Sequence, residues 1–247
     1  MGGHGEANGL EQPTWLHFLY SYHILPAWMP ETVPVTWLVI VILSVTVIAA
    51  SRKLRVRSPG RFQSCLEFTV VSLDNFVRGI VGDEAKTLAP IVGTFFIYIL
   101  TLNLFGLIPG FKSPTADTNT TVALAITAFV IVQYYAISRQ GFVRYLKHFW
   151  GEPWQLGFLM FPLHVIGELA RPLSLSIRLF GNIFGEETVI AVFILIVTSV
   201  LGKFLLPLQL PMMLFAVFGS FVQALVFSML VSIYIAVGIA GHEEHGH

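Results

Sequence analysis

Residues 204–242 read FLLPLQLPMMLFAVFGSFVQALVFSMLVSIYIAVGIAGH, a run of 39 positions without Lys, Arg, Asp or Glu. An α-helix of this length would reach about 58 Å, whereas roughly 20 residues suffice to cross the hydrocarbon core of a bilayer. Pro207 and Pro211 indicate a turn at the start of the run. The remainder predicts one long, strongly tilted membrane helix.

Three further uncharged runs have the length of a single crossing. Residues 32–51, 87–111 and 118–138 contain 20, 25 and 21 positions. A backbone in lipid is satisfied only in helices or closed barrels, and these runs lack the alternation of barrel strands. We therefore expect an all-α membrane protein without strands. Gly106, Pro109 and Gly110 predict the end of the helix that begins near residue 87.

The composition agrees with a membrane environment. Charged residues make up 11% of the 247 residues and hydrophobic residues make up 55%, whereas a soluble domain carries about 25% charged residues. The 14 basic and 14 acidic residues cancel. Without concentrated positive charge, nucleic-acid binding is excluded. A single cysteine, Cys65, excludes an intrachain disulfide and a cysteine-based metal site.

Residues 61–82 have a different pattern, in which apolar residues recur at three- and four-residue steps. The apolar set is Phe62, Leu66, Thr69, Val70, Leu73, Phe76, Val77, Ile80 and Val81, and the polar set between them is Gln63, Glu67, Asp74, Asn75 and Arg78. This spacing predicts an amphipathic helix. Such a helix suits the membrane interface, and it equally suits a position packed under the helix bundle.

Basic residues near the predicted helix ends indicate the orientation, because cytoplasmic loops carry an excess of Lys and Arg. Two groups follow the first and third uncharged runs and two single lysines lie on the other side: Arg52, Lys53, Arg55, Arg57 and Arg61; Arg139, Arg144 and Lys147; Lys112 and Lys203. We expect both groups in the cytoplasm. The polar N-terminal segment 1–31, which lacks the features of a signal peptide, is then outside. After five crossings the C-terminus is cytoplasmic.

The segment 156–202 has membrane character and yet holds several charged or polar residues, namely His164, Glu168, Arg171, Arg178, Asn182, Glu186 and Glu187. Arg178 lies deepest among apolar neighbours. An arginine at the bilayer centre costs about 2.5–3.5 kcal/mol on insertion scales, and intramembrane charges tend to be functional. Since a guanidinium keeps its charge in proteins, the segment holds a permanent cation.

Helical geometry indicates which groups that cation can meet. At about 100° per residue, His164, Arg171 and Asn182 lie within roughly 40° of Arg178 on one stripe. Glu187 lies on the opposite side, about 13 Å along the axis, and Glu186 lies about 80° round the helix. We therefore expect the anionic partner of Arg178 to come from elsewhere. Pro172 predicts a kink or a helix start beside Arg171.

Several polar residues have more than one interpretation. Gln223, with Ser220 one turn before it, has two interpretations. It either forms a hydrogen bond with a group that faces Arg178, or it only links two helices by a hydrogen bond. His164 is a satisfied bundle histidine or a relay group. Asn103 is a candidate packing amide.

Two further groups suit local structural roles. Glu168 and Arg171 have the spacing of an i,i+3 ion pair on one helix. Asp117 and Asn119 suit an N-cap of the helix that follows them, alone or with another role.

Four motifs together resemble subunit a of the F-type ATP synthase, the static proton-channel subunit. They are PLSLSIRLFGN at 172–182, FGSFVQALVFSMLVSIYIA at 218–236, NLFGLIPG at 103–110 and TADTNTTVALA at 115–125. The resemblance covers about residues 35 to 240. It implies one polytopic membrane domain over 1–247, with five transmembrane helices and one interfacial helix. The last two helices are long and steeply tilted, and 156–240 is the hairpin that carries the channel.

The resemblance also implies roles for individual residues. Arg178 occupies the position of the arginine that faces each passing carboxylate of the subunit c ring, and Asn182 and Gln223 line the path. Glu187, alone or coupled with Glu186, matches the acid of the outer half-channel. The resemblance places Asn103, Asp117 and Asn119 near the outer mouth and His164 toward the exit side, and Glu168 is a further candidate for proton translocation.

One position departs from several family members. They carry a histidine seven residues before the glutamine of the last helix, and this chain has Ala216 there. The adjacent acids Glu186 and Glu187 instead resemble plastid and many bacterial members.

We therefore expect the stator subunit of a rotary ATP synthase, with two offset proton half-channels and an arginine that promotes release and blocks leak. Its expected partners are the subunit c ring, peripheral stalk subunit b, the other synthase subunits and the lipid of a bacterial inner membrane. We expect no covalent chemistry, no cofactor and no metal. One alternative is a secondary transporter of an anionic solute with Arg178 as ligand. A membrane-embedded hydrolase or transferase is the other, although HExxH and GxSxG motifs are missing.

Overall fold

The computed structural model describes residues 32–52, 60–108, 111, 113–141, 145, 157–201 and 206–240. Within these ranges the chain forms α-helices and two short 3-10 turns, and no strand. The α-helices are α2 (Thr32–Arg52), α3 (Arg61–Val81), α4 (Ala85–Phe105), α5 (Thr118–Gln140), α7 (Gly157–Leu201) and α8 (Leu206–Ala240). The prediction of an all-α fold is confirmed for the described residues.

Some predictions concern residues outside these ranges. They include the polar segment 1–31, residue 156 at the start of the predicted hairpin, and the C-terminal tail beyond residue 240. Seven of the basic residues used to orient the chain also lie outside these ranges: Lys53, Arg55, Arg57, Lys112, Arg144, Lys147 and Lys203. The orientation of the chain therefore stays a prediction.

Four described helices are long and apolar enough to cross a membrane. They are α2, α4, α5 and the stretch Pro211–Ile239 of α8, with mean hydropathy between 1.8 and 2.5. α7 is not among them, although it has 45 residues. Charged side chains, from Glu168 to Glu187, lie within its otherwise apolar sequence.

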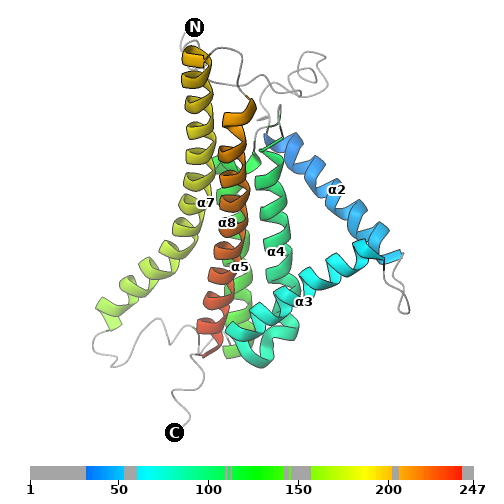
Figure 1. Ribbon diagram of the computed structural model, residues 1–247. Helices are drawn as coiled ribbons and strands as arrows, with labels where there is room; N and C mark the ends of the chain where they lie inside the picture. Colours follow the sequence, from blue (N-terminus) through cyan, green and yellow to red (C-terminus); the bar gives the residue numbers. More distant parts are fainter. Residues whose placement is uncertain are drawn as a thin grey trace.

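The centre of the fold is a bundle of α4, α5, α7 and α8 (Figure 1), in which α4 packs on α8 and α5 packs on α7. Buried side chains from all four helices form one apolar core, including Ile99, Leu124, Leu179 and Phe227. α2 stands apart from the bundle and leans away from it. Most of its large apolar side chains are exposed, as expected for a surface in contact with lipid.

α3 crosses the end of the bundle and contacts α4 and α8 (Figure 1). Val77 is buried on the bundle side, whereas Phe68, Val70 and Val71 are exposed. The predicted amphipathic helix is thus confirmed as a helix packed against the bundle. Its exposed apolar flank also suits a membrane interface.

Prolines interrupt neither of the last two helices. α7 runs from Gly157 to Leu201 with Pro162 and Pro172 inside it, so the predicted helix start at Pro172 is wrong, while Figure 1 shows α7 bent. A proline that removes one ladder hydrogen bond is tolerated in membrane helices. For the same reason Pro211 lies inside α8 and does not mark a turn. Pro207 lies in the first turn of α8, where a missing N–H costs little.

Candidate functional site

A chain of buried polar side chains lies where α4 ends and α5 begins. The Thr115 hydroxyl donates to Asn103 Oδ1 at 2.7 Å, and Thr115 Oγ1 and Ser113 Oγ are 2.7 Å apart. Ser113 Oγ also donates to the Leu102 carbonyl at 3.3 Å. All three polar side chains are buried. Asn103 is thus more than a packing amide, because it anchors the return of the chain from α4 to α5.

Glu187 on α7 joins this region through the backbone. The Ser113 N–H donates to Glu187 Oε1 at 3.0 Å, across 74 positions of sequence. Sequence reasoning missed both Ser113 and Thr115. Neither is charged, and the only signal was their place beside Pro114 in a polar stretch between two apolar runs.

Asp117 is the N-cap residue of α5, as predicted. Its Oδ1 accepts from the Asn119 N–H at 2.9 Å, which satisfies one of the free N–H groups at a helix start. Its Oδ2 accepts from the Thr32 hydroxyl at 2.6 Å. Asp117 therefore also ties the start of α2 to the start of α5. Asn119 is exposed and takes part in the cap through its backbone.

Arg178 lies on an exposed face of α7. In the described part of the chain it forms no hydrogen bond and no ion pair. Leu173 and Ile177, on the exposed half of the helix, are 61% and 60% exposed. Small residues lie along the side of α7 that carries Arg178, at three- and four-residue steps: Gly167, Ala170, Ser174, Gly181 and Gly185. Arg178 therefore projects from an exposed surface of apolar and small residues that also carries Asn182.

Asn182 and Gln223 connect α7 to α8. The Asn182 amide Nδ2 donates to Gln223 Oε1 at 2.5 Å. Gln223 and Ser220 are buried, whereas Asn182 belongs to the exposed face one turn beyond Arg178. Gln223 thus holds in place an amide that neighbours Arg178, so the two roles considered for it are compatible.

Glu186 leans against α8 at a place where α8 has no side chain. A Cβ on Gly219 would lie 3.1 Å from Glu186 Oε1. That oxygen is buried and has no hydrogen-bond partner among the described residues. Ala216, one turn before Gly219, is fully buried. The small residues of α8 therefore accommodate the carboxylate that the sequence places beside Glu187.

A second polar cluster lies near the other end of α7. The predicted ion pair is confirmed, because Arg171 Nη1 is 2.6 Å from Glu168 Oε1. Glu168 Oε2 accepts from Gln133 Nε2 at 2.7 Å, and Gln133 Oε1 accepts from the Tyr145 hydroxyl at 2.5 Å. Burial and the charge of Glu168 raise the pKa of Tyr145 above its usual value. The phenol therefore stays a donor at neutral pH.

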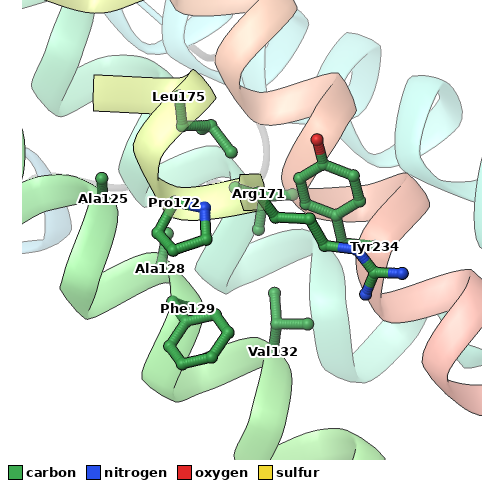
Figure 2. A pocket seen from close by; sticks show the side chains of 9 residues that line it. Ala125, Ala128, Phe129, Val132, Arg171, Pro172, Leu175 and Tyr234 are labelled. Carbon is green, nitrogen blue, oxygen red and sulfur yellow. The ribbon is translucent and has the colours of Figure 1, made fainter. Parts of the chain in front are cut away.

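Arg171 is further enclosed by α8. Its guanidinium carbon lies 5.2 Å from the centre of the Tyr234 ring, a favourable cation–π distance. Figure 2 shows Arg171 beside Tyr234, among the residues that line a small pocket, Pro172 and Phe129 included. The volume of this pocket is about 10 Å³. Arg171 and Arg178 share a predicted stripe, yet their surroundings differ. Sequence reasoning missed Gln133, Tyr145 and Tyr234, which carry no charge at neutral pH.

The predicted site residues therefore form two polar groups at different levels along α7, with three further residues between them. Asn103, Asp117 and Glu187 lie near the junction of α4 and α5, and Glu168 lies in the second cluster. His164 is half-buried one turn before Glu168 on α7. Between the groups lie Arg178, Asn182 and Gln223, and the structure brings only the last two into contact.

Comparisons with known proteins give one consistent answer. A family described as ATP synthase A chain matches residues 33–236. An ATP synthase subunit a of Protochlamydia amoebophila is 37% identical over 243 residues, 95% of this chain and 86% of that protein. Subunits a of Trichlorobacter lovleyi and Geobacter sulfurreducens are 45% and 42% identical. These alignments cover 81% and 83% of this chain, and 83% and 86% of those proteins.

The match includes every motif on which the resemblance rested, since each lies within residues 33–236. It spans α2 through most of α8, and therefore both polar clusters and Arg178. The chain belongs to the ATP synthase subunit a family.

Proposed function

We propose that this chain is the stator subunit of a rotary ATP synthase and offers two offset proton half-channels to a ring of subunit c. The observation that carries the proposal is the placement of Arg178. It is an exposed cation without a partner in the described residues, and polar clusters flank it on both sides along α7. By helical rise it lies about 13 Å from Glu187 and about 15 Å from Glu168.

In this proposal α7 also crosses the membrane, which brings the number of crossings from four to five. All five belong to a single polytopic domain whose 156–240 hairpin carries the channel. The length of α7 supports this, because 45 residues exceed the roughly 20 that one crossing needs. Its contacts with α5 and α8, two of the apolar helices, support it as well. Charged residues inside a membrane are costly and are retained where they serve transport.

The outer half-channel leads to Glu187 in this proposal. Glu187, Ser113, Thr115 and Asn103 form a continuous polar path from α7 to the end of α4. A buried polar group without a partner is unfavourable, and Asn103 Nδ2 and Glu186 Oε1, near this path, have no hydrogen-bond partner among the residues that the structure describes. Groups of this kind suit a route that protons and water visit.

The inner half-channel lies toward the His164 end of α7, where Glu168 is held by Arg171 and Gln133 and fixes the packing of the helix. Protons reach it after the protonated ring carboxyl has rotated through the lipid and returned to this subunit. The protonated carboxyl is neutral, so it crosses the lipid without the cost of a buried charge. On its return, the fixed cation favours the ionised carboxylate and promotes release. The same charge repels protons and prevents a direct leak between the half-channels.

The exposed face around Arg178 is the proposed contact with the ring. At Gly167, Gly181 and Gly185, a Cβ would meet no other atom within 4 Å. A helix of another subunit can therefore approach the backbone closely, as small residues allow in membranes. Peripheral stalk subunit b and the other synthase subunits complete the assembly. A bacterial inner membrane, with the N-terminus outside and the C-terminus in the cytoplasm, is the proposed setting. The chain itself makes and breaks no covalent bond.

Replacement of Arg178 by alanine tests the proposal. We expect the complex to assemble and ATP-driven proton pumping in inverted membrane vesicles to be lost, because no fixed cation then promotes the loss of the proton from the ring carboxyl. Arg171→Ala is the matched control, an arginine on the same helix that is already paired with Glu168. It should lower the amount of complex and leave pumping per complex measurable. Normal pumping by Arg178→Ala would overturn the proposal.

A further inference from the structure

We propose that the backbone N–H of Ser113 positions the Glu187 carboxylate for proton exchange, and that Gly106 is the residue that allows it to do so. The inference rests on the proposed function, in which Glu187 is the acid of the outer half-channel. The contact that supports it is the hydrogen bond that Ser113 N–H donates to Glu187 Oε1, at an N···O distance of 3.0 Å.

Gly106 makes the approach possible by having no side chain. A Cβ at this position would lie 2.4 Å from Ser113 Cβ, 2.8 Å from Ser113 Cα and 2.9 Å from Ser113 N. Two of these atoms belong to the backbone, so a rotamer change cannot relieve the overlap. Gly106 also ends α4, where its N–H bonds to the carbonyls of Asn103 and Leu104. Any larger residue there would push Ser113 away from α4.

Buried hydroxyl groups then hold Ser113 in place. Its Oγ bonds to the Leu102 carbonyl and lies 2.7 Å from Thr115 Oγ1, which in turn donates to Asn103. Ser113 and Thr115 are almost completely buried, at 1% and 0% exposure. The N–H therefore points toward α7 from a fixed location and does not follow the movement of a side chain.

A fixed N–H has a clear consequence for a glutamate on a helix surface. Ordering a free Glu side chain costs rotamer entropy, and a hydrogen bond to an ionised acceptor is among the stronger ones. The bond from Ser113 selects one orientation of the carboxylate. Misplacing a reacting group by about 1 Å can lower a rate on the order of a hundredfold.

Ser113→Pro removes this N–H with little change to the backbone. Ser113 has φ −62°, close to the angle of about −65° that proline imposes. We expect the complete complex to assemble and its ATP-driven proton pumping to fall by about tenfold or more. Ser113→Ala is the matched variant, because it keeps the N–H and removes only the hydroxyl. It should lower the rate by about threefold at most, since the anchoring bonds are each modest.

Two readouts separate positioning from a purely structural effect. The pH dependence of pumping should change shape in Ser113→Pro and remain parental in Ser113→Ala. In Glu187→Asp the carboxylate is one methylene shorter and already misses the N–H. Adding Ser113→Pro to this variant should then lower the rate no further, whereas independent damage would add. Gly106→Ala supplies a second route to the same loss if Ser113→Pro prevents assembly.

The outcomes are distinct. Pumping by Ser113→Pro at the level of Ser113→Ala, or additive losses with Glu187→Asp, would overturn the inference. If Glu187→Gln itself pumped normally, the failure would lie in the proposed function of Glu187 and not in the hydrogen bond alone.

Discussion

Glu168 and Glu187 are carboxylates on the same helix, and the structure holds them in different ways. Glu168 has an arginine 2.6 Å from one oxygen and an amide 2.7 Å from the other. Glu187 accepts a backbone N–H at 3.0 Å, and its neighbour Glu186 has a buried oxygen without a partner among the described residues. The contacts of Glu168 fix the packing of α7 against α5, and in our proposal Glu187 is the carboxylate that exchanges protons.

The same contrast separates two arginines seven positions apart. Arg171 is neutralised by Glu168 and stacked on Tyr234, whereas Arg178 is exposed and has no partner in the described chain. Charge alone does not identify the functional residue. What matters is whether this chain supplies the counter-charge, and for Arg178 we propose that a carboxylate of the ring supplies it.

Within this comparison, the largest expected effect is on proton pumping, when the Glu187 carboxylate is removed. Glu187→Gln should lower proton pumping per assembled complex by about a hundredfold, the scale of a lost proton-transfer group. Glu186→Gln should have a much smaller effect, because Glu187 keeps its contact with Ser113. The measurement is acidification of inverted membrane vesicles at equal amounts of complex.

Glu168→Gln is the control at the other end of α7. It should leave the rate per complex within about threefold of the parent, since its charge is already used by Arg171. A hundredfold loss in Glu168→Gln would place this residue in the proton path and erase the proposed distinction. Equal and negligible effects of Glu186→Gln and Glu187→Gln would contradict the role of Glu187.

An intermediate effect is expected on stability. Glu168→Gln leaves Arg171 without its counter-ion, and the two side chains are only 21% and 30% exposed. The loss of a bond to a charged group should destabilise the packing of α7 by about 1–3 kcal/mol. It is measured as a lower denaturant concentration for release of this chain from the solubilised complex.

The double variant Glu168→Gln/Arg171→Gln provides the control for that measurement. Removing both charges should recover part of the stability, because no unpaired charge remains. A double variant less stable than Glu168→Gln alone would mean that Arg171 stabilises the fold mainly through Tyr234.

The smallest expected effect is at the middle of the helix pair. Asn182→Ala and Gln223→Ala each break the bond between α7 and α8. A double-mutant cycle should give a coupling of about 0.6 kcal/mol, the average for hydrogen bonds between membrane helices. The unfolding of the solubilised complex reports it. Additive losses would indicate that the two amides act separately.

Local sequence patterns predicted most of the helix boundaries. The uncharged runs at 32–51 and 118–138 correspond to α2 and α5, and the amphipathic run 61–82 corresponds to α3. Gly106 ends α4 as expected. These predictions succeed because the length of a membrane crossing and the positions of breakers are local properties. Pro211 did not mark a turn and Pro172 did not start a helix, since neighbouring helices support a backbone that a soluble helix would not tolerate.

The site was predicted in part. The spacing of Glu168 and Arg171 predicted their ion pair, and the place of Asp117 before an apolar run predicted its cap. Long-range contacts were not predicted. Ser113 meets Glu187 across 74 positions, and Gln133 meets Glu168 across 35. Each contact joins residues on two different elements. The periodicity of a single helix therefore could not predict either contact.

The sequence alone was sufficient for the membrane environment, the helical class and a permanent charge in the segment that becomes α7, because these depend on residue types and run lengths. Only the tertiary structure decided which groups of other helices meet these charges. The spacing along α7 predicted the pair of Arg171 with Glu168, whereas the contacts of Tyr234 with Arg171 and of Gln133 with Glu168 come from helix packing. Arg178, seven positions further on, forms no such contact in the described residues. Electrostatic interactions depend on distance in space and on burial, and neither can be deduced from position along the chain.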